Sequence, residues 1–205
     1  NDNRLYVCGS NEYGQLGLGT YSEYEYYKEN IIVGDIMNAR FYCGLNNIYY
    51  VDNNNNLYVC GSNEYGQLGL GNNDNVNIFT RVDISGIHDN STNNIKHLYP
   101  FNNFTIITDT DNGMFSCGIN QYRQLGLNVN DTSVNTFTAI SFHFEFINNI
   151  ILNKNSLIFL SDDGKLFGVG NNDDKLLSIV DSNNNIVNTV NNITQFNSKI
   201  RSIKE

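Results

Sequence analysis

Fifteen residues of this sequence occur twice, and this duplication constrains the fold more than any other feature. Residues 5–19 read LYVCGSNEYGQLGLG, and residues 57–71 repeat the same letters 52 positions later. A third copy, MFSCGINQYRQLGLN, occupies residues 114–128, and a more divergent copy, LFGVGNNDDKLLSIV, occupies residues 166–180. A repeating period of about 50 residues is typical of solenoids and propellers, in which one small structural unit is stacked many times.

Each repeat also contains segments that favour β-strands. Three runs are β-branched or aromatic and are bounded by turn residues: 48–51, 105–108 and 157–160. Residues 111–113 (DNG) and 162–164 (DDG) predict hairpin turns, since glycine and asparagine tolerate positive φ. Weaker apolar stretches follow the glycine-rich segments at 78–82, 136–140 and 188–193. Short strands at this spacing, with no helical period, predict an all-β fold made of propeller blades.

The glycine-rich part of each repeat predicts a compact turn, because each glycine costs a helix about 1 kcal/mol relative to alanine. We expect its leucines to enter the core while its glycines let the backbone bend. The residues expected to have this structural role are Gly9, Gly14, Leu16, Gly17, Gly61, Gly66, Leu68, Gly69, Gly118, Leu125 and Gly126. The segment lacks the lysine and hydroxyl residue of a phosphate-binding loop, which argues against a nucleotide site.

Composition limits the classes of partner. The chain has 12 Lys plus Arg against 21 Asp plus Glu, a net charge of −9, and its cations are scattered, so a nucleic-acid ligand is not expected. No apolar run is long enough to predict a membrane span. The four cysteines each precede a glycine and form no zinc-binding spacing with the three histidines. We expect buried free thiols and an intracellular, reducing compartment, either cytoplasm or nucleus.

The run Cys-Gly-Ser-Asn-Glu-Tyr-Gly-Gln-Leu-Gly-Leu-Gly, with the upstream Cys43-Gly44 strand and its hairpin, resembles the signature of the regulator-of-chromosome-condensation repeat family. The resemblance extends over four successive copies and implies a seven-bladed β-propeller, in which each repeat contributes strands to two adjacent blades. Seven blades at this spacing need about 360 residues. We therefore expect residues 1–205 to be a single partial β-propeller, an arc of about four blades from a longer chain or a larger complex.

The sequence departs from the family at two sets of positions. Family repeats usually carry a histidine a few residues after the Cys-Gly pair of the first strand. In this chain the corresponding residues are Asn47, Phe104 and Ser156. The tryptophan usual before the second glycine is replaced by Cys8, Cys60, Cys117 and Val169. The chain has no tryptophan, which excludes tryptophan-based light sensing on this stretch. No histidine stands where the family's founding activity, guanine-nucleotide exchange on the small GTPase Ran, would use one.

The segment 20–30, TYSEYEYYKEN, is the most distinctive feature outside the repeat. We expect an inter-strand loop on the rim of the propeller, and tyrosines among acidic residues suit a protein interface. The candidate partner contacts are Tyr21, Glu23, Tyr24, Glu25, Tyr26 and Tyr27. The alternative is a solvated loop whose tyrosines cover a blade edge.

Two further segments are weaker candidates. Residues 83–94 contain the extra residues of one longer repeat and predict a surface insertion. Residues 141–146, SFHFEF, alternate in polarity and predict an edge strand with His143 and Glu145 on its outer face. No nucleophile stands beside this pair, so no catalytic, cofactor-binding or metal-ligating residue is predicted.

The sequence therefore favours a protein–protein interaction scaffold rather than an enzyme, although a fold alone does not determine function. One alternative is that the complete propeller is a guanine-nucleotide exchange factor for a small Ran-like GTPase. Another is that the propeller is the targeting module of a larger enzyme such as a ubiquitin ligase.

Overall fold

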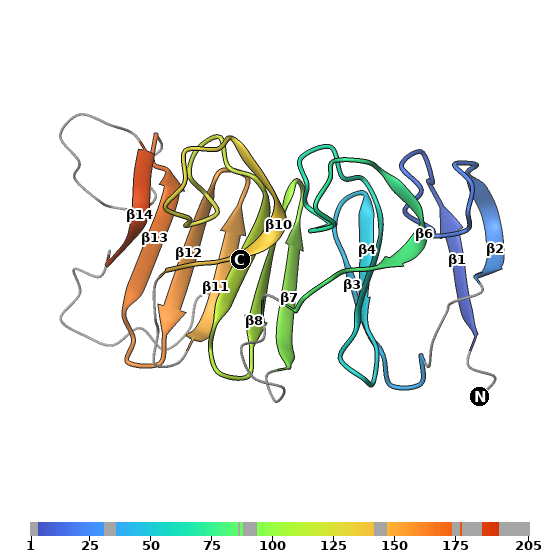
Figure 1. The fold of residues 1–205 in the computed structure, drawn as a ribbon, viewed down its shortest axis with the longest axis horizontal. Coiled ribbons are helices and arrows are strands. Elements are labelled where there is room, and N and C mark those ends of the chain that lie inside the picture. The colour runs from blue at the N-terminus through green and yellow to red at the C-terminus, as the bar shows by residue number, and fades with distance from the viewer. Residues whose placement is uncertain are drawn as a thin grey trace.

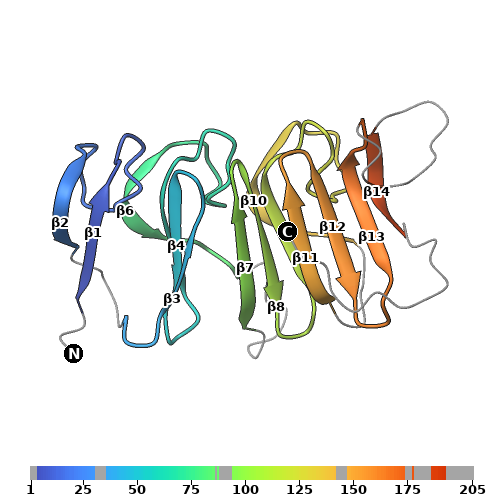
Figure 2. The ribbon, with the colours of Figure 1, turned by 180° about the vertical axis from the view of Figure 1, so that it is seen from behind.

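A computed structural model describes residues 4–30, 36–85, 87, 94–141, 147–173, 177 and 186–192. These residues form three four-stranded antiparallel sheets and one two-stranded sheet. The sheets stand side by side in chain order, from the two-stranded sheet at the blue end to β14 at the red end (Figure 1). The view from behind shows the same row of separate sheets (Figure 2). We call the sheets blades 1 to 4.

Blade 1 contains β1 (Leu5–Gly9) and β2 (Tyr24–Asn30). Blade 2 contains β3 (Arg40–Cys43), β4 (Asn47–Val51), β5 (Leu57–Gly61) and β6 (Val76–Arg81). Blade 3 contains β7 (Ile95–Phe101), β8 (Phe104–Asp109), β9 (Met114–Ile119) and β10 (Ser133–Ala139). Blade 4 contains β11 (Ile147–Asn153), β12 (Ser156–Ser161), β13 (Leu166–Asn171) and β14 (Ile186–Asn192). The repeat signatures thus begin at β1, β5, β9 and β13, and the all-β prediction is confirmed.

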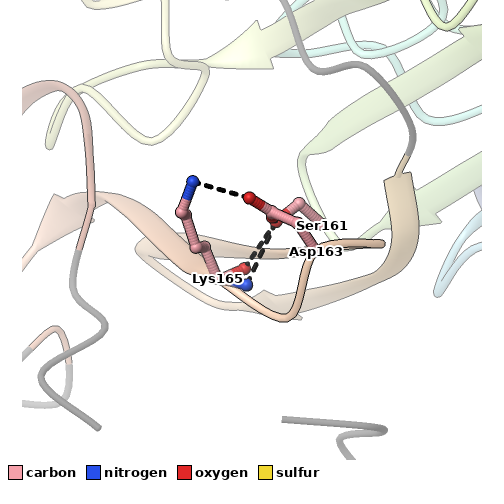
Figure 3. Close-up of polar contacts among 3 residues, drawn as sticks. All are labelled: Ser161, Asp163 and Lys165. Carbon is pink, nitrogen blue, oxygen red and sulfur yellow. Dashed lines mark hydrogen bonds and ion pairs between the residues drawn. The ribbon is translucent and has the colours of Figure 1, made fainter. Parts of the chain in front are cut away.

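The hairpin between the second and third strands has the same design in each complete blade. Its loop places one residue in the left-handed region, at Asn55, Asn112 or Gly164. In the 111–113 turn it is therefore Asn112, and not Gly113, that has the positive φ. In blade 4 the turn is tied by side chains (Figure 3): Ser161 Oγ donates to Asp163 Oδ1 at 2.5 Å, and Lys165 Nζ lies 2.6 Å from Asp163 Oδ2. Lys165 and then Ser161 lower the pKa of the Asp163 carboxyl.

The glycine-rich segments are compact turns, as predicted, and the structure adds that they join neighbouring blades. A Cβ on Gly14 would lie 2.6 Å from Asn77 Cα of the next blade, so only glycine permits this approach. The turn then pairs with the outer strand of that blade: Gly19 N–H donates to Asn77 O at 2.7 Å, and Gly71 N–H donates to Asn135 O at 2.8 Å. Isolated bridges Leu18–Ile78 and Leu70–Thr136 accompany these bonds.

The apolar core lies between the blades. One buried cluster contains side chains from blades 2 and 3, among them Tyr49, Leu68 and Ile107. A second contains side chains from blades 3 and 4, among them Leu125 and Phe159. The predicted turn leucines Leu16, Leu68 and Leu125 are all buried. Stacking of blades, rather than any single sheet, therefore provides the burial that stabilises the fold.

Candidate partner-binding surface

The tyrosine-rich segment is a strand for most of its length, which corrects the prediction of a loop. Residues 24–30 form β2, whose register with β1 runs from Leu5–Asn30 to Gly9–Tyr24. Tyrosine favours strands, and the free edge of β1 provides a hydrogen-bonding partner that outweighs the polar composition of the segment. Only residues 20–23 remain outside the strand.

The candidate contacts are mostly exposed. Tyr26 is 81% exposed, Tyr27 75% and Tyr21 51%, and Glu23 and Glu25 are also exposed. Tyr24 is half-buried; its hydroxyl lies 3.2 Å from Thr20 Oγ1, and Lys28 Nζ lies 5.5 Å from its ring centroid. The segment therefore presents apolar rings and carboxylates together on one strand.

The register of the other blades shows what each tyrosine of β2 corresponds to. Gly9 pairs with Tyr24 as Gly61 pairs with Val76 in blade 2, so Tyr26 corresponds to Ile78 and Tyr27 to Phe79. A Cβ on Gly17 would meet the Phe79 ring at 2.8 Å, whereas the Ile78 side chain remains 55% exposed. Tyr27 therefore occupies a blade-packing position, while Tyr26 occupies an outward-facing one.

The sequence analysis missed one set of buried polar residues that shape the turns. The Oδ1 atom of Asn11 accepts from Leu16 N–H at 2.9 Å, and Asn63 does the same for Leu68. The equivalent bonds of the third and fourth copies are Asn120 to Leu125 and Asn172 to Leu177. An asparagine five residues before a leucine is present in all four copies, so the signal was available even in the divergent fourth.

The cysteines are less uniform than predicted. Cys60 and Cys117 are fully buried, but Cys8 and Cys43 are exposed. The thiol of Cys60 donates to Gln15 O at 3.2 Å, and that of Cys117 donates to Gln67 O at 3.3 Å, each in the preceding blade. Burial raises the pKa of both thiols.

A polar junction between blades 2 and 3 surrounds the Gln67 carbonyl. The Tyr49 hydroxyl donates to it at 2.9 Å and lies 2.9 Å from Thr105 Oγ1, which also reaches the carbonyl at 2.9 Å. Burial, and then the neighbouring Cys117, raises the pKa of Tyr49. Fully enclosed and hydrogen-bonded, this junction holds two blades together rather than meeting a ligand.

The three residues that stand where the family usually has histidine are buried in the sheets. Asn47, Phe104 and Ser156 each begin the second strand of a blade and are buried. The described part of the chain contains no group of three His, Cys, Asp or Glu side chains placed to hold a metal ion. His143 and Glu145 lie outside the described residues, as does most of the 83–94 insertion. No helix among the described segments has the length and apolarity that a membrane crossing requires.

Comparison with known proteins identifies the repeat. The sequence model of the regulator of chromosome condensation (RCC1) repeat matches residues 2–27 and 54–87. The chain contains RCC1-type repeats. Mouse X-linked retinitis pigmentosa GTPase regulator is 31% identical over 144 residues, which are 69% of this chain and 14% of that protein. Bovine secretion-regulating guanine nucleotide exchange factor is 32% identical over 132 residues, 60% of this chain and 26% of that protein. The RCC1-type chain thus spans a small part of these relatives.

Solved structures confirm the fold. Yeast RCC1 (Prp20), in its complex with Kap60, superposes with a TM-score of 0.73 at 14% identity, covering 94% of this chain and 45% of that one. Human WBSCR16 superposes with a TM-score of 0.70 at 20% identity, covering 93% and 48%. A further structure of Prp20p, for which binding to Gsp1p and histones is described, gives 0.72 at 15% identity. The RCC1-type blades of this chain therefore form a partial β-propeller.

Proposed function

We propose that this RCC1-type arc is the protein-binding part of a propeller that regulates a small GTPase. The observation that carries the proposal is the exposed tyrosine–glutamate surface formed by Tyr21, Glu23 and Tyr26, whose rings and carboxylates stand outward on blade 1. Exposed tyrosines are over-represented among residues that dominate binding energy. The class of partner is supported by two relatives, one called a GTPase regulator and the other a guanine nucleotide exchange factor.

A binding measurement on the protein that contains this arc tests the proposal. We would immobilise it and measure the affinity of a panel of small GTPases in their GDP-bound, GTP-analogue-bound and nucleotide-free forms. The double variant Tyr21→Ser/Tyr26→Ser is expected to weaken binding at least tenfold, because a central tyrosine typically contributes about 2 kcal/mol. Ile78→Ser is the matched control, since Ile78 holds the position of Tyr26 in blade 2 and is 55% exposed.

If the double variant and Ile78→Ser weaken GTPase binding equally, the loss reflects a general disturbance of the fold, and the surface formed by Tyr21, Glu23 and Tyr26 is not the binding site. Unchanged binding by the double variant would place the GTPase elsewhere on the propeller. No binding by any GTPase of the panel would remove the proposed class of partner.

A second candidate function is guanine-nucleotide exchange, which the name of the bovine relative favours. The chain carries Asn47, Phe104 and Ser156 where family repeats carry histidine, so any exchange residues must come from other loops. The test is release of a fluorescent GDP analogue from the GTPase that binds best. If saturating protein does not release the GDP analogue faster than the GTPase does alone, the exchange function is contradicted and only a binding function remains.

A further inference from the structure

The surface between blades 2 and 3 is hollowed into a groove of about 500 Å³. Its wall combines β6, the outer strand of blade 2, with the glycine-rich turn that reaches β10 of blade 3. Leu70 and Val76 line the groove with apolar side chains, and Asp74, Arg81 and Asp83 line it with charges. Pockets of about 300 to 1,000 Å³ that combine apolar walls with a few polar groups are typical of ligand sites.

In blade 1 the chain's own side chains occupy the equivalent space. The strand registers of the two blades place Tyr24 at the position of Val76 and Lys28 at the position of Thr80, and both positions in blade 2 line the groove. The Tyr24 hydroxyl lies 3.2 Å from Thr20 Oγ1, and Lys28 Nζ lies 5.5 Å from the centroid of the Tyr24 ring. A tyrosine ring with a cation beside it therefore fills this space in blade 1.

Blade 2 supplies neither the ring nor the cation. Val76 and Thr80 are both shorter than the residues that they replace, and both are half-buried in the wall of the groove. Asn72, which also lines the groove, stands at the position of Thr20 and offers a side-chain amide in place of the hydroxyl. In blade 3 the same turn position holds Val129, which packs against the core cluster between blades 3 and 4. The groove of blade 2 thus has room for a ring that its own sequence does not provide.

The charges of the groove favour a cationic ligand. Two carboxylates, Asp74 and Asp83, line it against one guanidinium, that of Arg81, and all three side chains are exposed. The backbone N–H of Ser85 donates to Asp83 Oδ1 at 3.0 Å and lowers the pKa of that carboxyl, so it is ionised at neutral pH. Among the described residues no cation lies within ion-pair distance of either carboxylate. A ligand that brings its own cation, as Lys28 does in blade 1, would complement them.

We propose that this groove binds a tyrosine side chain of a partner protein, at a place in the partner where lysine or arginine stands beside the tyrosine. The ring takes the place that Tyr24 has in blade 1 and packs against Leu70 and Val76, while the cation faces Asp74 and Asp83. A tyrosine seated in a pocket is a common anchor of protein interfaces, and a nearby cation adds to its binding. The groove is separate from the tyrosine–glutamate surface of blade 1, so the proposal does not depend on GTPase binding.

The probe is the tripeptide Lys-Tyr-Lys, acetylated and amidated at its ends, and its contact with the protein is measured by saturation-transfer NMR. We expect saturable transfer to the protons of the tyrosine ring. The peptides Lys-Ala-Lys, which lacks the ring, and Glu-Tyr-Glu, which reverses the charge, should compete at least tenfold more weakly.

The decisive variant is Val76→Tyr/Thr80→Lys, which gives blade 2 the two side chains that fill the space in blade 1. We expect it to bind Lys-Tyr-Lys at least tenfold more weakly, because its own ring occupies the groove. The matched control is Tyr24→Val/Lys28→Thr, the reverse exchange in blade 1, which should bind the peptide at least as well as the original protein.

Three results overturn the proposal: no transfer to the ring protons, equal competition by either control peptide, or undiminished binding by a Val76→Tyr/Thr80→Lys variant that circular dichroism shows to be folded. Asp74→Asn/Asp83→Asn changes only exposed side chains and serves if the first variant does not fold. It should weaken Lys-Tyr-Lys but not Glu-Tyr-Glu, and equal binding of Lys-Tyr-Lys before and after the change contradicts the proposal. Self-association of the protein that Val76→Tyr/Thr80→Lys abolishes would make a second copy the occupant and overturn the assignment to a partner.

Discussion

Blades 1 and 2 contain the same fifteen residues in two different surroundings. In blade 2 the strand Leu57–Gly61 lies between two others, whereas the strand Leu5–Gly9 of blade 1 pairs with β2 alone among the residues that the structure describes. The turns that follow are buried alike, because each packs on the outer strand of the next blade, whereas the strands differ in burial. The comparison teaches that one sequence can encode two independent contacts, one made by its turn and the other by its strand.

The largest expected difference between the two copies is at the glycine that ends each strand. Gly61→Ala should lower the free energy of unfolding by about 3 to 5 kcal/mol, since a Cβ at positive φ is strained and also collides with Asn46. Gly9→Ala should cost about 1 to 2 kcal/mol, the strain alone. Urea unfolding of the two variants gives the comparison, and equal losses would show that the collision with Asn46 does not contribute to the cost of Gly61→Ala.

Truncation of the first leucine of each strand should also destabilise the two copies differently, but the difference in unfolding free energy should be smaller. Leu57 is fully buried in the core cluster between blades 2 and 3, so Leu57→Ala should cost about 3 kcal/mol. Leu5 is half-buried, so Leu5→Ala should cost about 1 kcal/mol. Thermal unfolding monitored by circular dichroism measures both, and a larger loss for Leu5 would reverse our account of the two strands.

Equivalent substitutions in the two turns should have equal effects on stability, and an unequal effect would contradict the comparison. Asn11→Ala and Asn63→Ala each remove the acceptor of a buried leucine N–H, and each should cost about 2 kcal/mol. Glu64→Ala, at an exposed position of the same turn, is the control with little expected effect. A difference of more than about 1 kcal/mol between the two asparagine variants would mean that the turns are not independent of their strands.

The smallest expected effect concerns the cysteines at alkaline pH. Burial raises the pKa of the Cys60 thiol in the folded state above its ordinary value of 9.0. Above pH 9 the thiol therefore ionises in the unfolded state but stays neutral in the folded one, so the free energy of unfolding falls as the pH rises. Each such thiol should lower the free energy of unfolding by about 1.4 kcal/mol per pH unit in that range. Cys60→Ala should therefore flatten the decline measured by urea unfolding between pH 9 and 10. An unchanged slope would contradict the burial of this thiol.

Sequence reasoning predicted the features that repeat. The glycine-rich turns, the hairpins and the strands at 48–51 and 105–108 could be found because local propensity and the packing of blades favour the same structure. The capping role of Asn63 was overlooked, although an asparagine recurs in every copy. It could have been recognised by asking which group satisfies the N–H groups of a turn too short to satisfy its own.

Other features could not be predicted from local sequence. Cys8 and Cys60 have identical neighbours in the chain, so only the contact with the preceding blade separates an exposed thiol from a buried one. The acidic composition of residues 24–30 concealed a strand whose pairing depends on β1. The partner is harder still to predict, because a surface such as Tyr21 and Tyr26 shows that binding is feasible and not what is bound.

Arg123 stands where the first two turns have Gly14 and Gly66, and it holds a φ of 63°. Leu127 is the counterpart of Leu18 and Leu70, and within the described residues it forms no such bridge. In the described part of the junction between blades 3 and 4, apolar side chains pack together, but the main-chain bonds seen at the two earlier junctions are not present. Under heat or mechanical load this junction should separate before the other two, and amide exchange in its glycine-rich turn should be faster than in the turns of blades 1 and 2.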